Sequence, residues 1–255
     1  MKKNVLLVIC CLVAYSEVTT SALNTLDELA IAYDTDKSSK GHNYIPVYHR
    51  YFKRLRNKEV KFLEIGFYKG ASARMWEKYF PNAALYFIDN NNLVPMDQYN
   101  KDLSTRSHCY VVDQSSEAEL RNFINQVGGD FDIIVDDGSH ISSHVILSFQ
   151  VLFPHLKPGG IYVVEDLHAS YWKANPFIPT LLYGGEGNLE NPIAGTHSAI
   201  NFFRKLIDDV NFIGSRTMHA NLNNCPPAIR QQLTYYQEHI AAMHFYPSLC
   251  LIIKR

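Results

Sequence analysis

Short apolar runs alternate with amphipathic segments through the middle of the chain. Runs of this length bounded by Gly, Pro or Asp are typical of buried strands, and apolar residues at helical spacing are typical of helices. The pattern predicts strands over residues 60–65, 84–88, 108–112, 131–135 and 160–164. It predicts helices over residues 70–79, 117–127 and 142–153, and a turn at 157–160. Strands that alternate with helices form βαβ units, so the pattern predicts a parallel sheet.

The two flanks of this region have a different pattern. Apolar residues recur at helical spacing within residues 24–57 and within residues 196–210, which predicts helices in both segments. Apolar runs at 240–245 and 249–254 surround Tyr246-Pro247-Ser248 and predict a hairpin that ends the sheet with an antiparallel strand. Residues 171–195 are rich in Gly, Pro and Asn, which predicts a loop over the strand ends that would serve as a substrate lid. The predicted fold is a doubly wound, mostly parallel α/β sheet with an N-terminal helical extension.

The N-terminus has the order of regions found in a secretory signal. Lys2 and Lys3 precede the apolar run Val5–Ala14, and the small residues Thr20-Ser21-Ala22 follow. The run is too short to span a bilayer comfortably, so no membrane span is expected in the mature chain. The predicted location is the secretory pathway or outside the cytoplasm, with a cytoplasmic protein that has a hydrophobic N-terminal helix as the alternative. The predicted division is a signal peptide at 1–22, a helical extension at 23–57 and the α/β domain at 58–255.

Composition narrows the classes of function. The chain has 255 residues, of which 47% are hydrophobic, and this is ample for one core. The 24 Lys and Arg residues nearly cancel the 25 Asp and Glu residues, so no basic surface for nucleic acid is expected. Three cysteines lie outside the predicted signal peptide: Cys109, Cys225 and Cys250. They are widely spaced and odd in number, so the sequence does not predict a disulfide framework.

A nucleotide site is predicted where the first strands end. Gly66 and Gly70 follow Glu64 and open a helix, so the backbone can approach a ligand closely. Their Gly-x-x-x-Gly spacing lacks the Gly-x-Gly-x-x-Gly pattern that fits a pyrophosphate. Asp89 ends the second strand, where a carboxylate can bind ribose hydroxyls, and Asp113 ends the third, beside the expected adenine. This favours S-adenosylmethionine over NAD, although an ordinary strand-to-helix turn has the same glycines.

Two further strands end in clusters of acidic and histidine residues. Asp136-Asp137-Gly138-Ser139-His140 follows one strand, and Glu165-Asp166-Leu167-His168 follows the next. Because ligands bind beyond the carboxyl ends of parallel strands, these side chains are expected at one edge of the sheet. Oxygen donors without a Cys cluster favour Mg²⁺ or Mn²⁺, and an imidazole beside the ion can act as a base. Taken singly, each Asp could be a helix cap and His140 an ordinary loop histidine.

The motifs resemble those of a known family. Phe62–Gly66, Phe87–Asp89 and Lys157–Gly160 are similar to motifs of class I S-adenosylmethionine-dependent methyltransferases. A narrower resemblance is to the macrocin and mycinamicin sugar O-methyltransferases, through Leu29–Phe52, Asp136–His140 and Glu165–His168. It covers about residues 26–170, and the region 171–195 departs from it, which leaves the acceptor open.

The resemblance implies an activity and a set of site residues. It implies a metal-assisted methyl transfer from S-adenosylmethionine to a hydroxyl of a sugar or of a glycosylated small molecule. It also implies that the N-terminal part, with Lys37 and Tyr44, covers cofactor and substrate, although simple surface polarity is the alternative. A homo-oligomer is among the expected states. The implied base is His140; the implied metal ligands are Asp137, Glu165 and Asp166; the implied cofactor-binding residues are Glu64, Gly66, Gly70, Asp89, Asp113 and Asp136.

Two other classes of protein stay open at this point. The first is a secreted binding protein that keeps the fold without turnover, because S-adenosylmethionine is made in the cytosol. The second is a hydroxylase-like oxidoreductase of the cephalosporin-hydroxylase type, because a fold alone does not fix the chemistry. For Asp136, a role in bracing the turn is the alternative to contact with the cofactor.

Overall fold

The computed structural model describes residues 25–90, 95–218 and 222–255. The predicted signal peptide at 1–22 lies outside these ranges. Within them, none of the helices combines the length and the apolar character that crossing a membrane requires.

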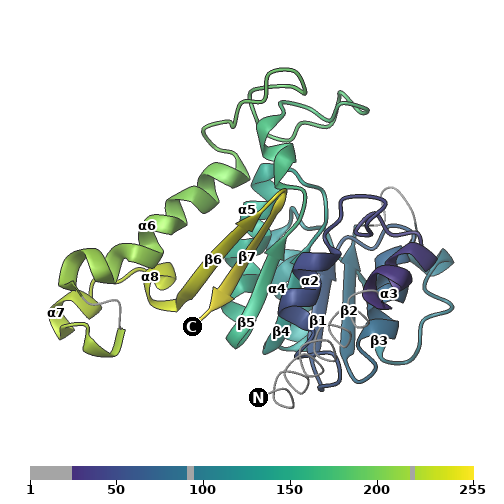
Figure 1. Cartoon of the computed structure of the whole chain (residues 1–255), viewed down its shortest axis with the longest axis horizontal. Helices are drawn as coiled ribbons and strands as arrows, with labels where there is room; N and C mark the ends of the chain where they lie inside the picture. Colours follow the sequence, from purple (N-terminus) through teal and green to yellow (C-terminus); the bar gives the residue numbers. More distant parts are fainter. Residues whose placement is uncertain (1–24, 91–94, 219–221) are drawn as a thin grey trace, which may run out of the picture.

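The described residues form one seven-stranded sheet with the order β3-β2-β1-β4-β5-β7-β6 (Figure 1). Strands β1 to β5 are parallel, and β7 is antiparallel to both β5 and β6. The predicted mostly parallel α/β sheet with an antiparallel C-terminal strand is therefore confirmed. The strands are β1 Lys61–Ile65, β2 Ala84–Asp89, β3 Ser107–Val111, β4 Phe131–Asp136, β5 Leu156–Val164, β6 Ile240–Tyr246 and β7 Leu249–Lys254.

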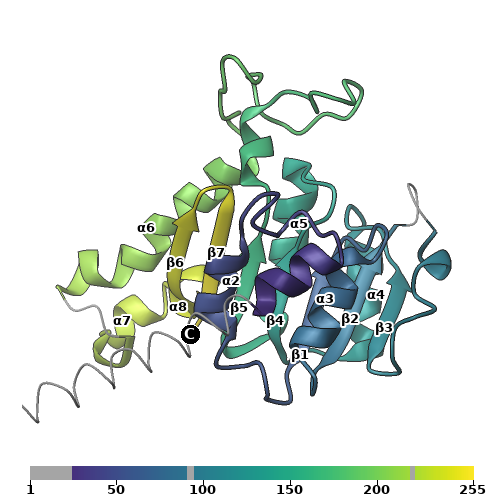
Figure 2. The same ribbon diagram turned by 45° about the vertical axis from the view of Figure 1, so that its right-hand side comes forward.

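Helices cover both faces of the sheet, as Figures 1 and 2 show. One face carries α4, α5 and α6, and the other carries α2, α3 and a helical segment over residues 25–32. The α-helices are α2 Ile45–Phe52, α3 Ala71–Tyr79, α4 Glu117–Val127, α5 Ser142–Leu152, α6 Ala199–Thr217, α7 Pro227–Arg230 and α8 Tyr235–His239. Short 3₁₀ turns are η1 Met96–Gln98, η2 Phe153–His155, η3 Leu167–Tyr171 and η4 Leu222–Asn224.

Burial on both faces explains why the central strands have continuous apolar runs. In β4, Ile133 and Val135 pack into the core under α2 and α3, whereas Ile134 between them packs into the core under α4 and α5. Successive side chains of a strand point to opposite faces, so both positions must be apolar when both faces are covered.

The structure corrects the predicted turn at 157–160. These residues lie inside β5, which runs from Leu156 to Val164. The pairing of β4 with β5 shifts register between Phe131 and Ile133, and Gly159 has a φ of 78°. The Pro-Gly-Gly composition is therefore accommodated as an irregularity in a strand and not as the end of one.

Two regions beyond η3 differ in how well they match the prediction. The segment 172–195 is irregular, with isolated bridges between Trp172 and Gly187 and between Ala174 and Leu182. It projects beyond the carboxyl ends of the strands (Figure 1), which agrees with the predicted loop. Helix α6 is longer than the predicted 196–210, and α7 and α8 were not predicted.

A buried carboxylate ties α3 to the segment before β3. Glu77 Oε1 accepts hydrogen bonds from the backbone N of Ser104 (2.8 Å), from its hydroxyl (2.7 Å) and from the hydroxyl of Ser107 (2.7 Å). Burial is the largest influence on this carboxyl and raises its pKa. The bonds from Ser107 and Ser104 and the charge of Arg106 together outweigh burial, so the pKa of Glu77 is lowered.

We therefore expect Glu77→Gln to lower the free energy of unfolding by about 1–3 kcal/mol at neutral pH. A lowered pKa means that the charged form contributes stability above the ordinary Glu pKa, and that this contribution is lost as the pH falls through the lowered value. In urea unfolding, the gap between Glu77→Gln and the wild type should shrink below about pH 4. Glu117→Gln, at an exposed ion pair with Arg121, is the control and should change little. A gap that does not depend on pH would contradict the argument.

Candidate active site

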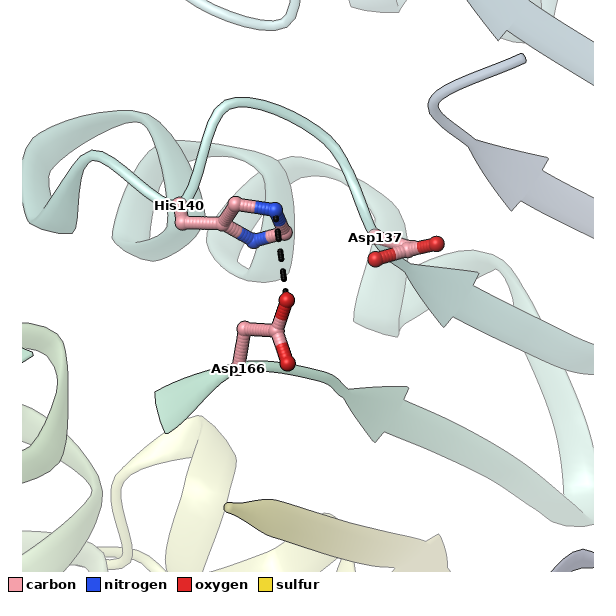
Figure 3. A group of neighbouring side chains, drawn as sticks. All are labelled: Asp137, His140 and Asp166. Carbon is pink, nitrogen blue, oxygen red and sulfur yellow. Dashed lines mark ion pairs between the residues drawn. The ribbon is translucent and has the colours of Figure 1, made fainter. Parts of the chain in front are cut away.

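The carboxyl ends of β1, β4 and β5 bring the predicted acidic residues together. Strand β4 lies between β1 and β5, and its last residue, Asp136, is in register with Ile65 on one side and Val164 on the other. The residues that follow these positions therefore meet at one edge of the sheet. Carboxylate oxygens of Glu64, Asp137 and Glu165 lie within 4.8 Å of one another, and so do ligand atoms of Asp137, His140 and Asp166. Figure 3 shows the second of these groups.

Lys37 lies in the middle of the first group. Its Nζ forms an ion pair with Asp137 Oδ2, and it lies 3.0 Å from Glu165 Oε1 and 3.5 Å from Glu64 Oε1. The Lys37 side chain is only 1% exposed, so the interpretation of this residue as surface polarity is wrong. Burial lowers the pKa of Lys37, but the three carboxylates outweigh this effect, and the pKa is raised well above its ordinary value.

Glu165 and Asp166 are consecutive but face different partners. Glu165 is buried and accepts a hydrogen bond from the Tyr48 hydroxyl. Asp166 has a φ of 52° and accepts a hydrogen bond of 2.5 Å from the Tyr44 hydroxyl. Tyr44 precedes α2 and Tyr48 lies one turn further along, so the start of one helix contacts both carboxylates.

His140 faces Asp166 across the site. His140 Nε2 lies 3.6 Å from Asp166 Oδ2, and the His140 side chain is 21% exposed. Burial raises the pKa of Asp166, but His140, Tyr44, His42 and His168 together outweigh burial and lower it. Asp166 is therefore the charged partner of this imidazole (Figure 3).

Among the described residues, the ammonium of Lys37 forms ion pairs with three carboxylates of the site. The pKa of Glu64 is raised to about 7, chiefly by burial. Burial is also the main cause of the raised pKa values of Asp137 and Glu165, and for Glu165 the neighbouring Asp137 adds to it. A hard divalent cation needs oxygen ligands and would offset this charge. The donors of the group Asp137, His140 and Asp166 fit Mg²⁺ or Mn²⁺, whereas Glu165 falls in the group around Lys37, so the predicted set of Asp137, Glu165 and Asp166 stays a prediction.

The glycine turn after β1 is packed directly against the acidic edge. Gly66 has a φ of 94°, and a Cβ atom there would lie 2.1 Å from the carbonyl oxygen of Asp137. Gly70 has a φ of 69° and precedes α3. Asp89 Oδ2 accepts hydrogen bonds from the backbone N of Phe67 (2.8 Å) and of Tyr68 (2.9 Å), which fixes this turn. The predicted donor site and the predicted metal site are thus neighbours.

Asp136 lies beneath the turn that carries Asp137 and His140. It is buried and accepts hydrogen bonds from Gln114 Nε2 (2.6 Å), Ser148 Oγ (2.5 Å) and the Tyr162 hydroxyl (3.1 Å). Burial raises its pKa to about 6. These contacts match the bracing alternative, and contact with the cofactor stays a prediction.

Asp113 lies at the end of β3, near the start of α4. Its Oδ1 accepts hydrogen bonds from the backbone N (2.8 Å) and the hydroxyl (2.7 Å) of Ser115. Its predicted place beside an adenine stays a prediction, because these bonds only show that it shapes the turn.

Some residues of the site were not singled out in the sequence. Tyr48 was missed, although it follows Tyr44 by four residues and so shares its helix face. Gln114, Ser148 and Tyr162 were missed because only the folded chain places them around Asp136. His168, from the second acidic cluster of the sequence, has its Nδ1 3.9 Å from Asp166 Oδ1.

Comparison with known proteins agrees with this geometry. Residues 63–167 match the family model described as a methyltransferase domain. The mycinamicin VI 2''-O-methyltransferase of Micromonospora griseorubida is 34% identical over 236 residues, and the demethylmacrocin O-methyltransferase of Streptomyces fradiae is 32% identical over 242 residues. Residues 63–167 are a methyltransferase domain, and the chain is similar to the mycinamicin and macrocin O-methyltransferases.

A solved structure extends the match to the fold of the methyltransferase domain. MycE methyltransferase from the mycinamycin biosynthetic pathway, in complex with Mg, SAH and mycinamycin VI, has a TM-score of 0.70 and 30% identity. The match covers 90% of this chain and 53% of that one. The two curated relatives are covered over 52% and 54% of their lengths, against 90% and 92% of this chain. The chain therefore spans about half the length of the relatives it matches.

Proposed function

We propose that this protein is an O-methyltransferase that uses S-adenosylmethionine and a divalent cation to methylate a hydroxyl of a sugar or glycosylated small molecule. The observation that carries the proposal is the group of Asp137, His140 and Asp166 beside the Gly66–Gly70 turn. The relatives support it, because they are named as O-methyltransferases and the MycE structure holds Mg, SAH and mycinamycin VI.

The residues divide into two binding sets. Gly66, Gly70 and Asp89, with Glu64, Asp113 and Asp136 around them, would hold the methyl donor. Asp137, Glu165 and Asp166 would hold Mg²⁺ or Mn²⁺. When bound, the donor supplies an electrophilic methyl group and the cation lowers the pKa of the acceptor hydroxyl.

His140 would take the proton in the reaction. With the donor bound, the acceptor oxygen would displace the sulfur from the methyl carbon, and His140 would accept the hydroxyl proton. Because Nε2 of His140 faces Asp166, Nδ1 is the nitrogen that receives the proton. Asp166 orients the ring and stabilises the imidazolium that forms. The products are a methyl ether and S-adenosylhomocysteine.

The two other classes of protein fit the site less well. A non-catalytic protein has no need for an imidazole held against a half-buried carboxylate, yet His140 and Asp166 form this pair. A hydroxylase of the cephalosporin-hydroxylase type shares the acidic edge, but the relatives compared above are named methyltransferases.

An acceptor screen tests the proposed reaction. The purified protein would be incubated with S-adenosylmethionine, Mg²⁺ and a panel of glycosides, and products identified by mass spectrometry. A methylated glycoside that forms with Mg²⁺ and not with EDTA is the expected result. An oxidised product in place of a methyl ether would support the hydroxylase alternative and contradict the proposal.

We expect His140→Ala to lower the rate of methyl transfer by about 10²–10⁴-fold, because it removes the proton acceptor. The affinity for S-adenosylhomocysteine should stay within about two-fold, since His140 is assigned no role in donor binding. Single-turnover kinetics and calorimetry measure the two effects separately. His108→Ala, at an exposed position of strand β3, is the matched control and should leave both unchanged. An equal loss of affinity and rate would remove His140 from the role of base.

We also propose that the N-terminal segment directs the protein to the secretory pathway. The support is the order of basic, apolar and small residues before Leu23. Mass spectrometry of the N-terminus of the protein purified from its source tests this. An uncleaved chain in the cytosol would contradict it.

A further inference from the structure

A groove of about 390 Å³ opens beside the acidic site, among η3, α6 and the β6–β7 hairpin. In Figure 1, helix α6 begins near the tip of this hairpin. Leu167, Ile200, Ile207 and Phe245 give the groove apolar walls. Ile207 is 43% and Phe245 39% exposed, so these apolar side chains are accessible. The volume is in the range of small-molecule sites.

The charged side chain that lines this groove is a guanidinium. Arg204 of α6 donates a hydrogen bond of 2.8 Å to the Tyr171 hydroxyl, and its Cζ lies 5.7 Å from the centre of the same ring. It also donates a hydrogen bond of 2.8 Å to Asn201 Oδ1. These neutral partners hold the guanidinium at the groove without cancelling its charge.

A second guanidinium lies behind the opposite wall. Arg50 of α2 donates a hydrogen bond of 3.1 Å to the hydroxyl of Tyr246, which lines the groove. Across the ranges that the structure describes, neither Arg50 nor Arg204 has a carboxylate within the 4.0 Å of an ion pair. The groove therefore presents positive charge next to apolar surface, in a chain whose net charge is −1.

The groove is connected to the reactive group through His168. This imidazole lines the groove, and its Nδ1 lies 3.0 Å from Ser248 Oγ and 3.9 Å from Asp166 Oδ1. Asp166 is also the partner of His140. His140 and His168 thus share Asp166 as a neighbour, which places the groove next to the proposed base.

We infer that the acceptor is an acidic glycoside, whose apolar part lies in this groove and whose anionic group binds Arg204. The inference rests on the proposed function, because that function defines the reacting hydroxyl. Binding of an acidic glycoside in the groove can still be measured without methyl transfer. A planar guanidinium favours a carboxylate, which can accept two parallel hydrogen bonds. Apolar walls alone would accept a neutral glycoside equally well, so the guanidinium is what selects the charge.

The test compares two probes that differ only at C6 of the sugar: para-nitrophenyl β-D-glucuronide, which has a carboxylate there, and para-nitrophenyl β-D-glucoside, which has a neutral hydroxymethyl group. Calorimetric titration of the full chain should give at least about ten-fold tighter binding of the glucuronide, as expected for a hydrogen bond to a charged group. Arg204→Gln should remove this preference, and Arg204→Lys should keep part of it. Arg216→Gln, an exposed change further along the same helix, is the matched control and should keep all of it.

A parallel titration with S-adenosylhomocysteine separates this inference from the proposed function. Equal affinity for the two probes, or a preference that survives in Arg204→Gln, would overturn the acidic-acceptor inference even if S-adenosylhomocysteine binds. An Arg204-dependent preference in a protein that does not bind S-adenosylhomocysteine would support the groove and count against the methyltransferase.

Discussion

Asp137→Asn is expected to lower metal-dependent methyl transfer on the order of 10³-fold or more. Asp137 is the residue shared by both groups of potential ligands, with Glu64 and Glu165 on one side and His140 and Asp166 on the other. Loss of the Asp137 charge should therefore weaken cation binding. It should also disturb the alignment of the acceptor hydroxyl with His140. The measurement is the initial rate at saturating Mg²⁺, with donor binding followed separately by calorimetry.

The matched control is Asp132→Asn, which makes the same chemical change on strand β4. Asp132 accepts hydrogen bonds from the backbone N of Lys61 and from Lys157 Nζ, away from the acidic edge. It should affect stability and leave the rate per folded molecule unchanged. Wild-type turnover by Asp137→Asn would remove Asp137 from the mechanism.

Lys37→Met is expected to lower the free energy of unfolding by about 3–5 kcal/mol in EDTA. The ammonium of Lys37 is the cation that contacts Asp137, Glu165 and Glu64, and its side chain is 1% exposed. Without it, the carboxylates of Asp137, Glu165 and Glu64 repel one another and lose the counter-charge that Lys37 supplies. Mg²⁺ should restore part of the loss, because an ion that binds only the folded state stabilises it.

Urea unfolding in EDTA and in Mg²⁺ measures both parts of this prediction. Lys157→Met is the control, since its ion pair with Asp132 is 42% exposed at the lysine and should contribute no more than about 1 kcal/mol. A Lys37→Met variant as stable as the wild type in EDTA would show that the ammonium is not what balances the acidic cluster.

The parts of the site that follow from strand order could be predicted from the sequence. Asp137, His140, Glu165 and Asp166 were placed at one sheet edge because each follows an apolar run, and parallel strands end at the same edge. The same reasoning misread Lys157–Gly160, because Pro and Gly normally end a strand, whereas here a register shift lets β5 continue.

The parts that depend on tertiary contact could not be predicted. Lys37 is 100 residues from Asp137 in the chain, and no periodic pattern links them. The divergence of Glu165 and Asp166 depends on the positive φ at Asp166, which a non-glycine residue rarely adopts. Arg204 meets Tyr171 only because α6 packs beside η3.

Calorimetric titration of S-adenosylmethionine into the purified protein, first with Mg²⁺ and then with EDTA, tests the central claim most directly. The donor should bind in the micromolar range, and its affinity or heat of binding should change when the cation is removed, since Gly66 packs against the backbone of Asp137. Absence of binding under both conditions would contradict the proposal that this protein is an S-adenosylmethionine-dependent methyltransferase.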